Sequence, residues 1–235
     1  MKSAGGESPK REIIITSDGS TTIYIPEWNE QYHSKHGAIQ EAYHVFIKHG
    51  LEACKTSEVS ILEMGFGTGL NAFISFLEAE KNSMKISYHG IEAYPVNFNE
   101  LRQLNYVAEL RAEQFGETFR LMHDIPWEKK RKLSKNFEII KRQQSFHEIK
   151  DENRFDLVYF DAFGARVQPD LWTVELFALM FKAMKINGIL VTYSAKGSVR
   201  RALQTVGFDV ERLAGPPGKR EMLRATKINC LGESL

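Results

Sequence analysis

The sequence predicts an α/β fold with a mainly parallel β-sheet, and three observations support this fold class. Short apolar stretches typical of buried strands alternate with stretches of helical periodicity. A glycine-rich turn at residues 65–69 stands between one such strand and the helix that follows it. The length of 235 residues suits one domain, and no repeat, low-complexity block or Pro/Gly-rich linker divides the chain.

The first part of the chain does not follow this alternation. Residues 12–15 and 21–25 flank a Ser-Asp-Gly-Ser turn, which predicts a β-hairpin, and residues 37–53 have the apolar spacing of an amphipathic helix. We therefore expect a flexible N-terminus (1–10), a hairpin and helix extension packed on the core (11–57) and a Rossmann-like domain (58–235).

The predicted sheet domain begins at residue 58. The expected strands are 59–62, 86–91, 155–160 and 189–193, and the expected helices are 70–81, 96–108 and 169–184.

Two segments, 118–121 and 137–141, compete for a further central strand. We prefer 137–141, because this choice leaves a short crossover to Phe155 and makes 119–135 an insertion. Near the end, Gly-Pro-Pro-Gly separates 207–213 from 221–226, so these two segments are expected to form an antiparallel pair. Such a pair departs from a purely parallel dinucleotide-binding sheet.

Composition excludes several classes of protein. A formal charge of +1 and 43% hydrophobic residues are typical of an ordinary globular chain. Cys54 and Cys230 are far apart and have no CxxC partner, so they build neither a disulfide framework nor a structural zinc site. No stretch approaches the roughly 20 apolar residues that span a bilayer. We expect a cytoplasmic protein with no membrane association, whose His33, His36 and His44 are structural or surface residues and bind no metal.

The glycine-rich turn carries the first chemical motif. Strand 59–62 runs into Glu63-Met64-Gly65-Phe66-Gly67-Thr68-Gly69-Leu70-Asn71. Glycines allow positive φ and a close approach of a ligand, and the next helix offers free N–H donors, which suits a nucleotide-like cofactor. The dinucleotide fingerprint needs glycine where Leu70 stands, and a P-loop needs Gly-Lys-Ser/Thr. The pattern ExGxGxG instead resembles the first motif of class I S-adenosylmethionine (AdoMet) methyltransferases.

Two acidic residues follow later strands of the predicted sheet. Glu92 ends strand 86–91, where a carboxylate accepts hydrogen bonds from ribose hydroxyls, although an acid there is often only solvated. Asp161 follows strand 155–160 at the ligand-binding edge, where it could orient a substrate amine and assist proton removal. Phe163 could stack on a base. The alternative is that Asp161 caps the next turn and Phe163 belongs to the core.

With these motifs placed, nearly the whole chain resembles the methyltransferase domain of MnmC and its stand-alone form, MnmD. Five ordered stretches carry the resemblance, namely 32–34 through 41–46, 62–71, 161–163, 168–173 and 218–223.

The resemblance implies AdoMet-dependent conversion of 5-aminomethyl-(2-thio)uridine at the tRNA wobble position to the 5-methylaminomethyl form, with Asp161 as the active-site acid. FAD is not expected, because this sequence ends where fused family members continue into an FAD-dependent oxidase domain. Where many relatives carry Gly-Asp to meet the adenine, this chain has Gln143-Gln144. The assignment of Gln144 to the adenine contact therefore departs from the family pattern.

These inferences give a set of expected site residues, with Asp161 as the catalytic residue and Phe163, Lys219 and Arg220 as substrate-binding residues. The expected cofactor-binding residues are Glu63, Gly65, Phe66, Gly67, Thr68, Gly69, Asn71, Glu92, Gln144 and Asp161.

Basic residues form three clusters along the chain. If they converge, they form a phosphate-binding rim for the tRNA anticodon loop, whereas a single cluster is more often a solvated face. The clusters are Lys129 to Lys132 with Lys135, then Lys196, Arg200 and Arg201, and then Lys219, Arg220 and Arg224.

Other functions stay open at this stage. One is a small-molecule or protein N-methyltransferase, because fold alone does not fix the substrate. Another is a non-catalytic module that binds AdoMet or RNA. A nicotinamide oxidoreductase is disfavoured by Leu70. The sequence does not determine the oligomeric state or the choice of tRNA.

Overall fold

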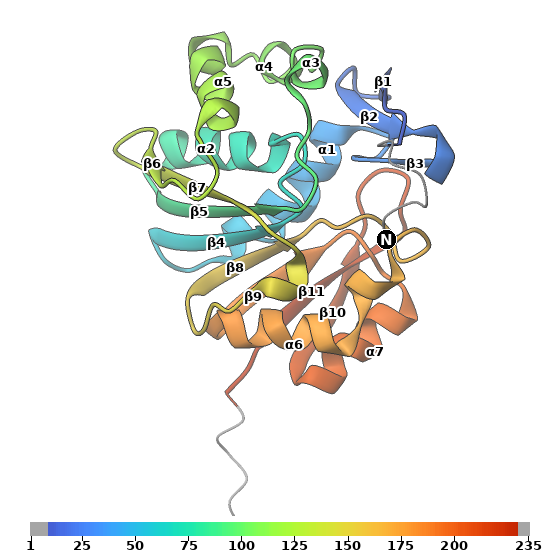
Figure 1. The fold of residues 1–235 in the computed structure, drawn as a ribbon. Helices are drawn as coiled ribbons and strands as arrows, with labels where there is room; N and C mark the ends of the chain where they lie inside the picture. Colours follow the sequence, from blue (N-terminus) through green and yellow to red (C-terminus); the bar gives the residue numbers. More distant parts are fainter. Residues whose placement is uncertain (1–8, 230–235) are drawn as a thin grey trace, which may run out of the picture.

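A computed structural model describes residues 9–229 and confirms the α/β fold class (Figure 1). Its main sheet has eight strands in the order β10-β11-β9-β8-β4-β5-β7-β6. The strands are β4 (Glu58–Met64), β5 (Lys85–Glu92), β6 (Arg131–Lys132), β7 (Phe137–Gln143), β8 (Phe155–Phe160), β9 (Met184–Thr192), β10 (Phe208–Ala214) and β11 (Glu221–Lys227).

The centre of this sheet is parallel and its edges are antiparallel. Parallel pairing joins β9 to β8, β8 to β4, β4 to β5 and β5 to β7. The antiparallel pair predicted at the end of the chain is confirmed as β10 and β11, and β11 also pairs antiparallel with β9. The preferred strand 137–141 is confirmed as β7, whereas the competing segment 118–121 lies in helix α5 (Gly116–Asp124).

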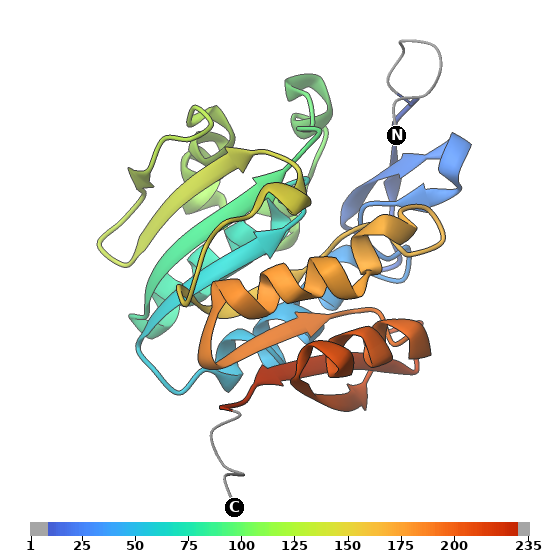
Figure 2. The same cartoon turned by 60° about the horizontal axis from the view of Figure 1, so that its bottom comes forward.

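Helices cover both faces of the sheet (Figures 1 and 2). Helices α1 (Ala38–Ala42), α2 (Leu70–Asn82) and α5 lie on one side, and α6 (Val174–Ala183) and α7 (Gly197–Val206) lie on the other. Along β8, Leu157 and Tyr159 belong to one buried cluster, and Val158 and Phe160 belong to the other. This alternation explains the continuous apolar runs in the sequence, since both faces of each central strand are buried.

The N-terminal segment forms its own three-stranded antiparallel sheet. The predicted hairpin is confirmed as β1 (Glu12–Ile15) and β2 (Thr21–Ile25), to which the unpredicted β3 (Glu30–Gln31) adds. The Thr21 N–H donates to Asn105 Oδ1 at 2.8 Å, and Arg11 lies 3.2 Å from Glu100. Because both partners follow β5, this small sheet lies at the carboxyl edge of the main sheet.

Some predictions concern residues that the structure does not describe. Most of the expected flexible start (1–10) lies outside residues 9–229, and so does Cys230. Within the described range, no helix is both long and apolar enough to cross a membrane.

Three predicted helices are wrong in extent. The segment 96–108 forms two short helices, α3 (Phe98–Leu101) and α4 (Tyr106–Glu109). Asn97 caps the start of the first helix together with Glu100. The break before the second helix occurs where the Asn105 side chain bonds Thr21 and Gly19 of the N-terminal segment. The segment 37–53 is helical only as α1 and Tyr43–Lys48, with a separate 3₁₀ turn at Leu51–Ala53 after Gly50.

The third of these helices, predicted at 169–184, starts as a 3₁₀ turn at Pro169–Trp172, and α6 ends at Ala183. It ends there because Met184 already has the extended conformation with which β9 begins. Helix α7 was not predicted.

One buried charge lies on β7. Lys141 is 1% exposed, its ammonium donates to the His123 carbonyl at 2.6 Å, and it lies 4.9 Å from the centre of the Trp127 ring. Burial lowers the pKa of Lys141 to about 8. The unfolded chain therefore binds more protons than the folded chain between about pH 8 and the ordinary lysine pKa near 10.

We expect the free energy of unfolding of the wild type to rise relative to that of Lys141→Met as the pH increases from about 7.5 to about 9.5. The reason is that the buried ammonium loses its charge over this range, and the relative gain should be about 1–2 kcal/mol. Urea unfolding at both pH values measures it, with the exposed Lys132→Met as control. An unchanged difference between wild type and Lys141→Met would contradict the expectation.

Candidate active site

The glycine-rich loop connects β4 to α2 and requires glycine for steric reasons. Gly65, Gly67 and Gly69 have φ angles of 98°, 48° and 72°. A Cβ atom on Gly65 would lie 2.7 Å from the backbone oxygen of Asp161. The N–H groups of Gly65 and Phe66 both donate to the Ile91 carbonyl, at 3.0 and 2.9 Å. The loop is therefore fixed against the ends of both β5 and β8.

Asn71, in the first turn of α2, joins two carboxylates behind the loop. Its Nδ2 donates to Glu63 Oε1 at 3.0 Å and to Asp161 Oδ2 at 2.9 Å. Glu63 is 1% exposed, and burial raises its pKa well above the ordinary value. The Oδ1 atom of Asn71 is buried and has no hydrogen-bond partner among the described residues, so it can accept a hydrogen bond from a bound group.

Glu92 ends β5 and lies beside the same loop. Its Oε2 accepts the Gly67 N–H at 3.0 Å, and its Oε1 accepts the Tyr94 N–H at 2.9 Å. Burial raises the pKa of Glu92, while these backbone hydrogen bonds oppose the rise. Each carboxylate oxygen keeps a second lone pair, so the two oxygens can accept hydrogen bonds from the two hydroxyl groups of a ribose.

These features fit AdoMet, the cofactor expected from the sequence. The glycine backbone lets a ligand approach, and the first turn of α2 has N–H groups without intrahelical partners, which suits a carboxylate. Glu92 fits the ribose, and the acceptor Oδ1 of Asn71 fits an ammonium group.

Asp161 lies beside the glycine-rich loop at the carboxyl edge of the sheet. It directly follows β8, its N–H donates to the Met64 carbonyl at 3.1 Å, and the residue as a whole is half-buried. Burial of its carboxyl group, and next the negative charge of Glu41, raise the pKa of Asp161 to about 7, against the effects of Asn71 and Lys219. This carboxyl group therefore exchanges a proton near neutral pH.

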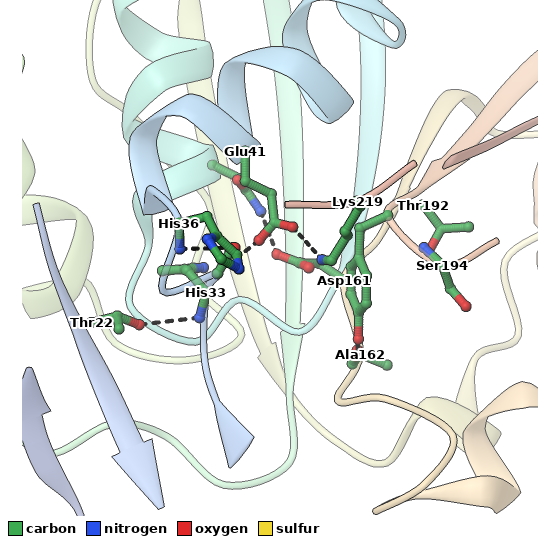
Figure 3. Close-up of polar contacts among 12 residues, drawn as sticks. Thr22, His33, His36, Glu41, Asp161, Ala162, Thr192, Ser194 and Lys219 are labelled. Atoms are coloured by element: carbon green, nitrogen blue, oxygen red, sulfur yellow. Dashed lines mark hydrogen bonds and ion pairs between the residues drawn. The ribbon is translucent and has the colours of Figure 1, made fainter. Parts of the chain in front are cut away.

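Lys219 and Glu41 form an ion pair beside Asp161 (Figure 3). The Lys219 ammonium, on the turn between β10 and β11, donates to Glu41 Oε1 and lies 3.9 Å from the centre of the Tyr193 ring. The other Glu41 oxygen accepts the Ser34 N–H at 2.9 Å. The Tyr193 hydroxyl donates to the Ala162 carbonyl at 2.8 Å, so the ring is held in place.

Sequence reasoning gave Glu41 no role, although Glu41 lies in one of the stretches that carry the family resemblance. Its partner Lys219 is 178 positions away, and no local pattern marks two such residues as neighbours.

The N-terminal segment also supports the glycine-rich loop. His33 shares a hydrogen bond of 2.7 Å with Thr68 Oγ1, and the Tyr106 hydroxyl donates to the same oxygen at 3.2 Å. Burial lowers the pKa of His33 to about 4, so the ring is neutral at physiological pH. The expectation that His33 is structural agrees with this contact. A Cβ on Gly67 would meet the Tyr32 ring at 3.1 Å, so this loop residue also touches the segment.

Phe163 and Phe66, two of the expected ligand-binding residues, pack against other aromatic rings. Phe163 meets Trp28 and Tyr32 edge-on, with ring centres 5.6 and 5.0 Å apart. Phe66 is 3% exposed and packs near Trp127.

The two remaining expected site residues make none of the side-chain contacts described above, although Gln144 follows Gln143, which pairs with Glu92 across β5 and β7. Gln144 follows β7 and lines a surface pocket with Arg142 and Asp151. Arg220 is exposed beside Lys219 on the turn between β10 and β11. Among residues 9–229, no group of three or more His, Cys, Asp or Glu side chains could hold a metal ion.

The basic clusters do not converge on one rim. Residues 129–135 lie around β6, and residues 219–224 lie around β11, which are at opposite sides of the sheet order. With strands about 4.8 Å apart, the two clusters are separated by roughly 30 Å. The condition for a continuous phosphate-binding rim is therefore not met by these two clusters, because strand order separates them.

Comparison with known proteins places the chain in a family. A sequence profile described as S-adenosyl-L-methionine-dependent methyltransferase matches residues 103–228. A protein of Delftia acidovorans, named tRNA 5-methylaminomethyl-2-thiouridine biosynthesis bifunctional protein MnmC, is 30% identical over 223 residues, which are 87% of this chain and 33% of that protein. A protein of the same name from an Azoarcus species is 30% identical over 227 residues, which are 90% of this chain and 35% of that protein.

A solved structure supports the same assignment. The crystal structure of MNMC2 from Aquifex aeolicus matches with a TM-score of 0.75 and 26% identity, covering 94% of this chain and 71% of that one. The chain spans about a third of the length of the two curated relatives. Since the family profile matches more than half of the chain, this protein belongs to the S-adenosyl-L-methionine-dependent methyltransferases.

Proposed function

We propose that this methyltransferase acts on the amine nitrogen of 5-aminomethyl-(2-thio)uridine at the wobble position of tRNA and converts it to the 5-methylaminomethyl form. The observation that carries the proposal is the position of the Asp161 carboxylate, which Asn71 holds beside the glycine-rich loop. Burial, which raises the pKa of this group to about 7, supports a role in proton transfer. The names of the MnmC relatives and of MNMC2 support the choice of a tRNA substrate.

The cofactor would lie along the carboxyl ends of β4 and β5. AdoMet, when bound, supplies an electrophilic methyl group. The backbone of residues 65–69 and the first turn of α2 would hold its amino-acid portion, and Glu92 would accept hydrogen bonds from its ribose. Glu63 would act through Asn71, whose amide it fixes.

Asp161 would manage the proton on the substrate amine. An alkyl ammonium has a pKa near 10 and no free lone pair, so the amine must lose a proton before it attacks. Moving that proton to a carboxylate of pKa about 7 costs about 5 kcal/mol, compared with about 9 kcal/mol for an ordinary aspartate. The free nitrogen would then accept the methyl group that AdoMet supplies, with the cofactor sulfur as leaving group, and a second N–H proton would leave to water.

Methyl transfer from labelled AdoMet to tRNA that carries 5-aminomethyl-2-thiouridine tests the proposal. Fully modified tRNA is the control, and mass analysis of the nucleosides identifies the product. We expect a mass gain of one methyl group at that uridine. AdoMet binding without any transfer would overturn this choice of substrate and favour another amine or a non-catalytic role.

We expect Arg220→Glu to weaken binding of the tRNA anticodon loop. The slope of log Kd against the logarithm of the salt concentration should become shallower by about 1, which corresponds to the loss of one phosphate contact. The reason is that Arg220 is exposed next to Lys219, whose side chain lies beside Asp161. Fluorescence anisotropy over a range of salt concentrations measures the effect. Arg131→Glu, at the opposite side of the sheet, is the matched control. Equal losses in both variants would show that Arg220 makes no specific contact.

A further inference from the structure

The ion pair between Glu41 and Lys219 lies inside the site and is mostly shielded from solvent. The Glu41 side chain is 9% exposed and that of Lys219 is 31% exposed. Figure 3 shows the two side chains pointing toward each other next to the Asp161 carboxylate. Exposed ion pairs contribute little to stability, and shielding an ion pair from water adds a desolvation cost. Stability alone therefore does not explain this pair, and we look for its role in the chemistry of the site.

The backbone that carries Lys219 is fixed. A Cβ on Gly218 would lie 2.2 Å from the His36 ring, so this ring packs directly on the turn backbone, where Gly218 has a φ of 83°. The Lys219 N–H donates to the Pro216 carbonyl at 2.9 Å, and the Gly215 N–H donates to the Arg220 carbonyl at 3.1 Å. The ammonium is thus held between Glu41 and the Tyr193 ring rather than swinging freely.

Other titratable groups face these three residues, and most are neutral. Glu63, Tyr88 and Tyr193 face Asp161, and burial raises the pKa of each, which keeps the tyrosines neutral and favours protonated Glu63. His33 faces the ion pair and is neutral, because burial lowers its pKa. Asp18 acts on His33 from the N-terminal sheet, and its hydrogen bonds lower its pKa and keep it ionised.

The local charge is therefore set by one ammonium and two carboxyl groups. With Lys219 and Glu41 paired, ionised Asp161 leaves one negative charge, which a single substrate ammonium neutralises. Without Lys219, two neighbouring carboxylates would compete for a proton. Without Glu41, an unbalanced ammonium would keep Asp161 ionised and repel a cationic amine.

We propose that Glu41 is a positioning residue that holds Lys219 beside Asp161, and that this pair sets the proton affinity of Asp161 and selects a cationic alkyl amine as substrate. The proposal rests on the proposed function for the identity of the amine. Its electrostatic part concerns only this chain and is tested without substrate.

Carbon-13 NMR of labelled aspartate carboxyl groups tests the electrostatic part in the free enzyme, with the Asp161 signal assigned from its loss in Asp161→Asn. Glu41→Gln removes a negative charge and should lower the pKa of Asp161 by about 1 pH unit. Lys219→Met removes a positive charge and should raise the upper pKa of the Asp161 and Glu41 pair by about 1 pH unit. The pKa of Asp161 in the double variant Glu41→Gln/Lys219→Met should be closer to the wild-type value than the pKa in either single variant.

Activity measurements test the catalytic part. With the 5-aminomethyl-2-thiouridine tRNA as substrate, the acid limb of the plot of kcat/KM against pH should shift to lower pH in Glu41→Gln and to higher pH in Lys219→Met. The KM for this tRNA should also rise in Glu41→Gln. Lys219→Arg keeps the charge and should keep the limb close to its wild-type position. Glu58→Gln, which removes the partner of Lys85 far from the site, is the matched control and should change neither measurement.

The outcomes separate the two proposals. Opposite shifts of the Asp161 pKa support the electrostatic role even if the tRNA is not methylated, in which case only the substrate assignment fails. Shifts in the same direction, or none, overturn the role of the pair even if the tRNA is methylated. If Lys219→Met does not fold, Glu41→Gln still decides, because an unchanged or raised Asp161 pKa contradicts the proposal.

Discussion

Replacing Asp161 with asparagine should lower the single-turnover rate of methyl transfer by about 10²–10⁴-fold while changing AdoMet affinity by less than about tenfold. The amide has nearly the shape of the carboxyl group and can still accept the hydrogen bond from Asn71, but it cannot take a proton from the substrate amine. The acid limb of the pH profile near pH 7, which we assign to this carboxyl group, should disappear.

Labelled AdoMet in rapid-quench experiments gives the rate, and calorimetry gives the affinity. Asp170→Asn is the matched control, because Asp170 is exposed in the 3₁₀ turn before α6. A rate within about threefold of wild type would remove Asp161 from the proton-transfer step. A rate loss matched by an equal loss of AdoMet affinity would instead assign it to cofactor binding.

Gly65→Ala should reduce AdoMet affinity by about 100-fold or more and lower the free energy of unfolding by about 2–4 kcal/mol. Two causes combine, since alanine is strained at a φ of 98° and its Cβ would lie 2.7 Å from the Asp161 carbonyl. That oxygen is backbone at the end of a central strand, so relief of the clash would move the loop away from β8. The displaced loop would then no longer offer its backbone to the cofactor.

Gly116→Ala provides the matched control for this loop variant. Gly116 begins α5 with a φ of −57°, and a Cβ there would meet only a Val107 methyl group, at 3.6 Å. Alanine favours the helix and restricts the unfolded chain, so this change should stabilise the protein by up to about 1 kcal/mol. Chemical denaturation and AdoMet titration of both variants decide the matter. Similar effects in both would contradict the steric argument for Gly65.

The two carboxylates of the proposed site were found from sequence because the signals are local. Each strand is a short apolar run, and Glu92 and Asp161 stand where such runs end. Parallel strands bring their carboxyl ends to one edge of the sheet, so residues at those positions meet without knowledge of the side-chain contacts. The same rule gives the position of the glycine-rich loop.

One local expectation failed where a side chain bonded to a distant segment. Residues 96–108 have helical spacing throughout, but Asn105 bonds Thr21 in the N-terminal sheet, and the helix is interrupted. The separation of the basic clusters follows from strand order, which charge and spacing along the chain do not encode.

The sequence by itself determined the α/β class, the glycine-rich loop and the carboxylates at the strand ends, because hydrophobic periodicity and turn chemistry are short-range properties. Only the tertiary structure decided that His33 bonds Thr68 and that Glu41 pairs with Lys219 beside Asp161. Such contacts join segments far apart in the chain, and they exist only because burial of both sheet faces and the order of the strands bring those segments together.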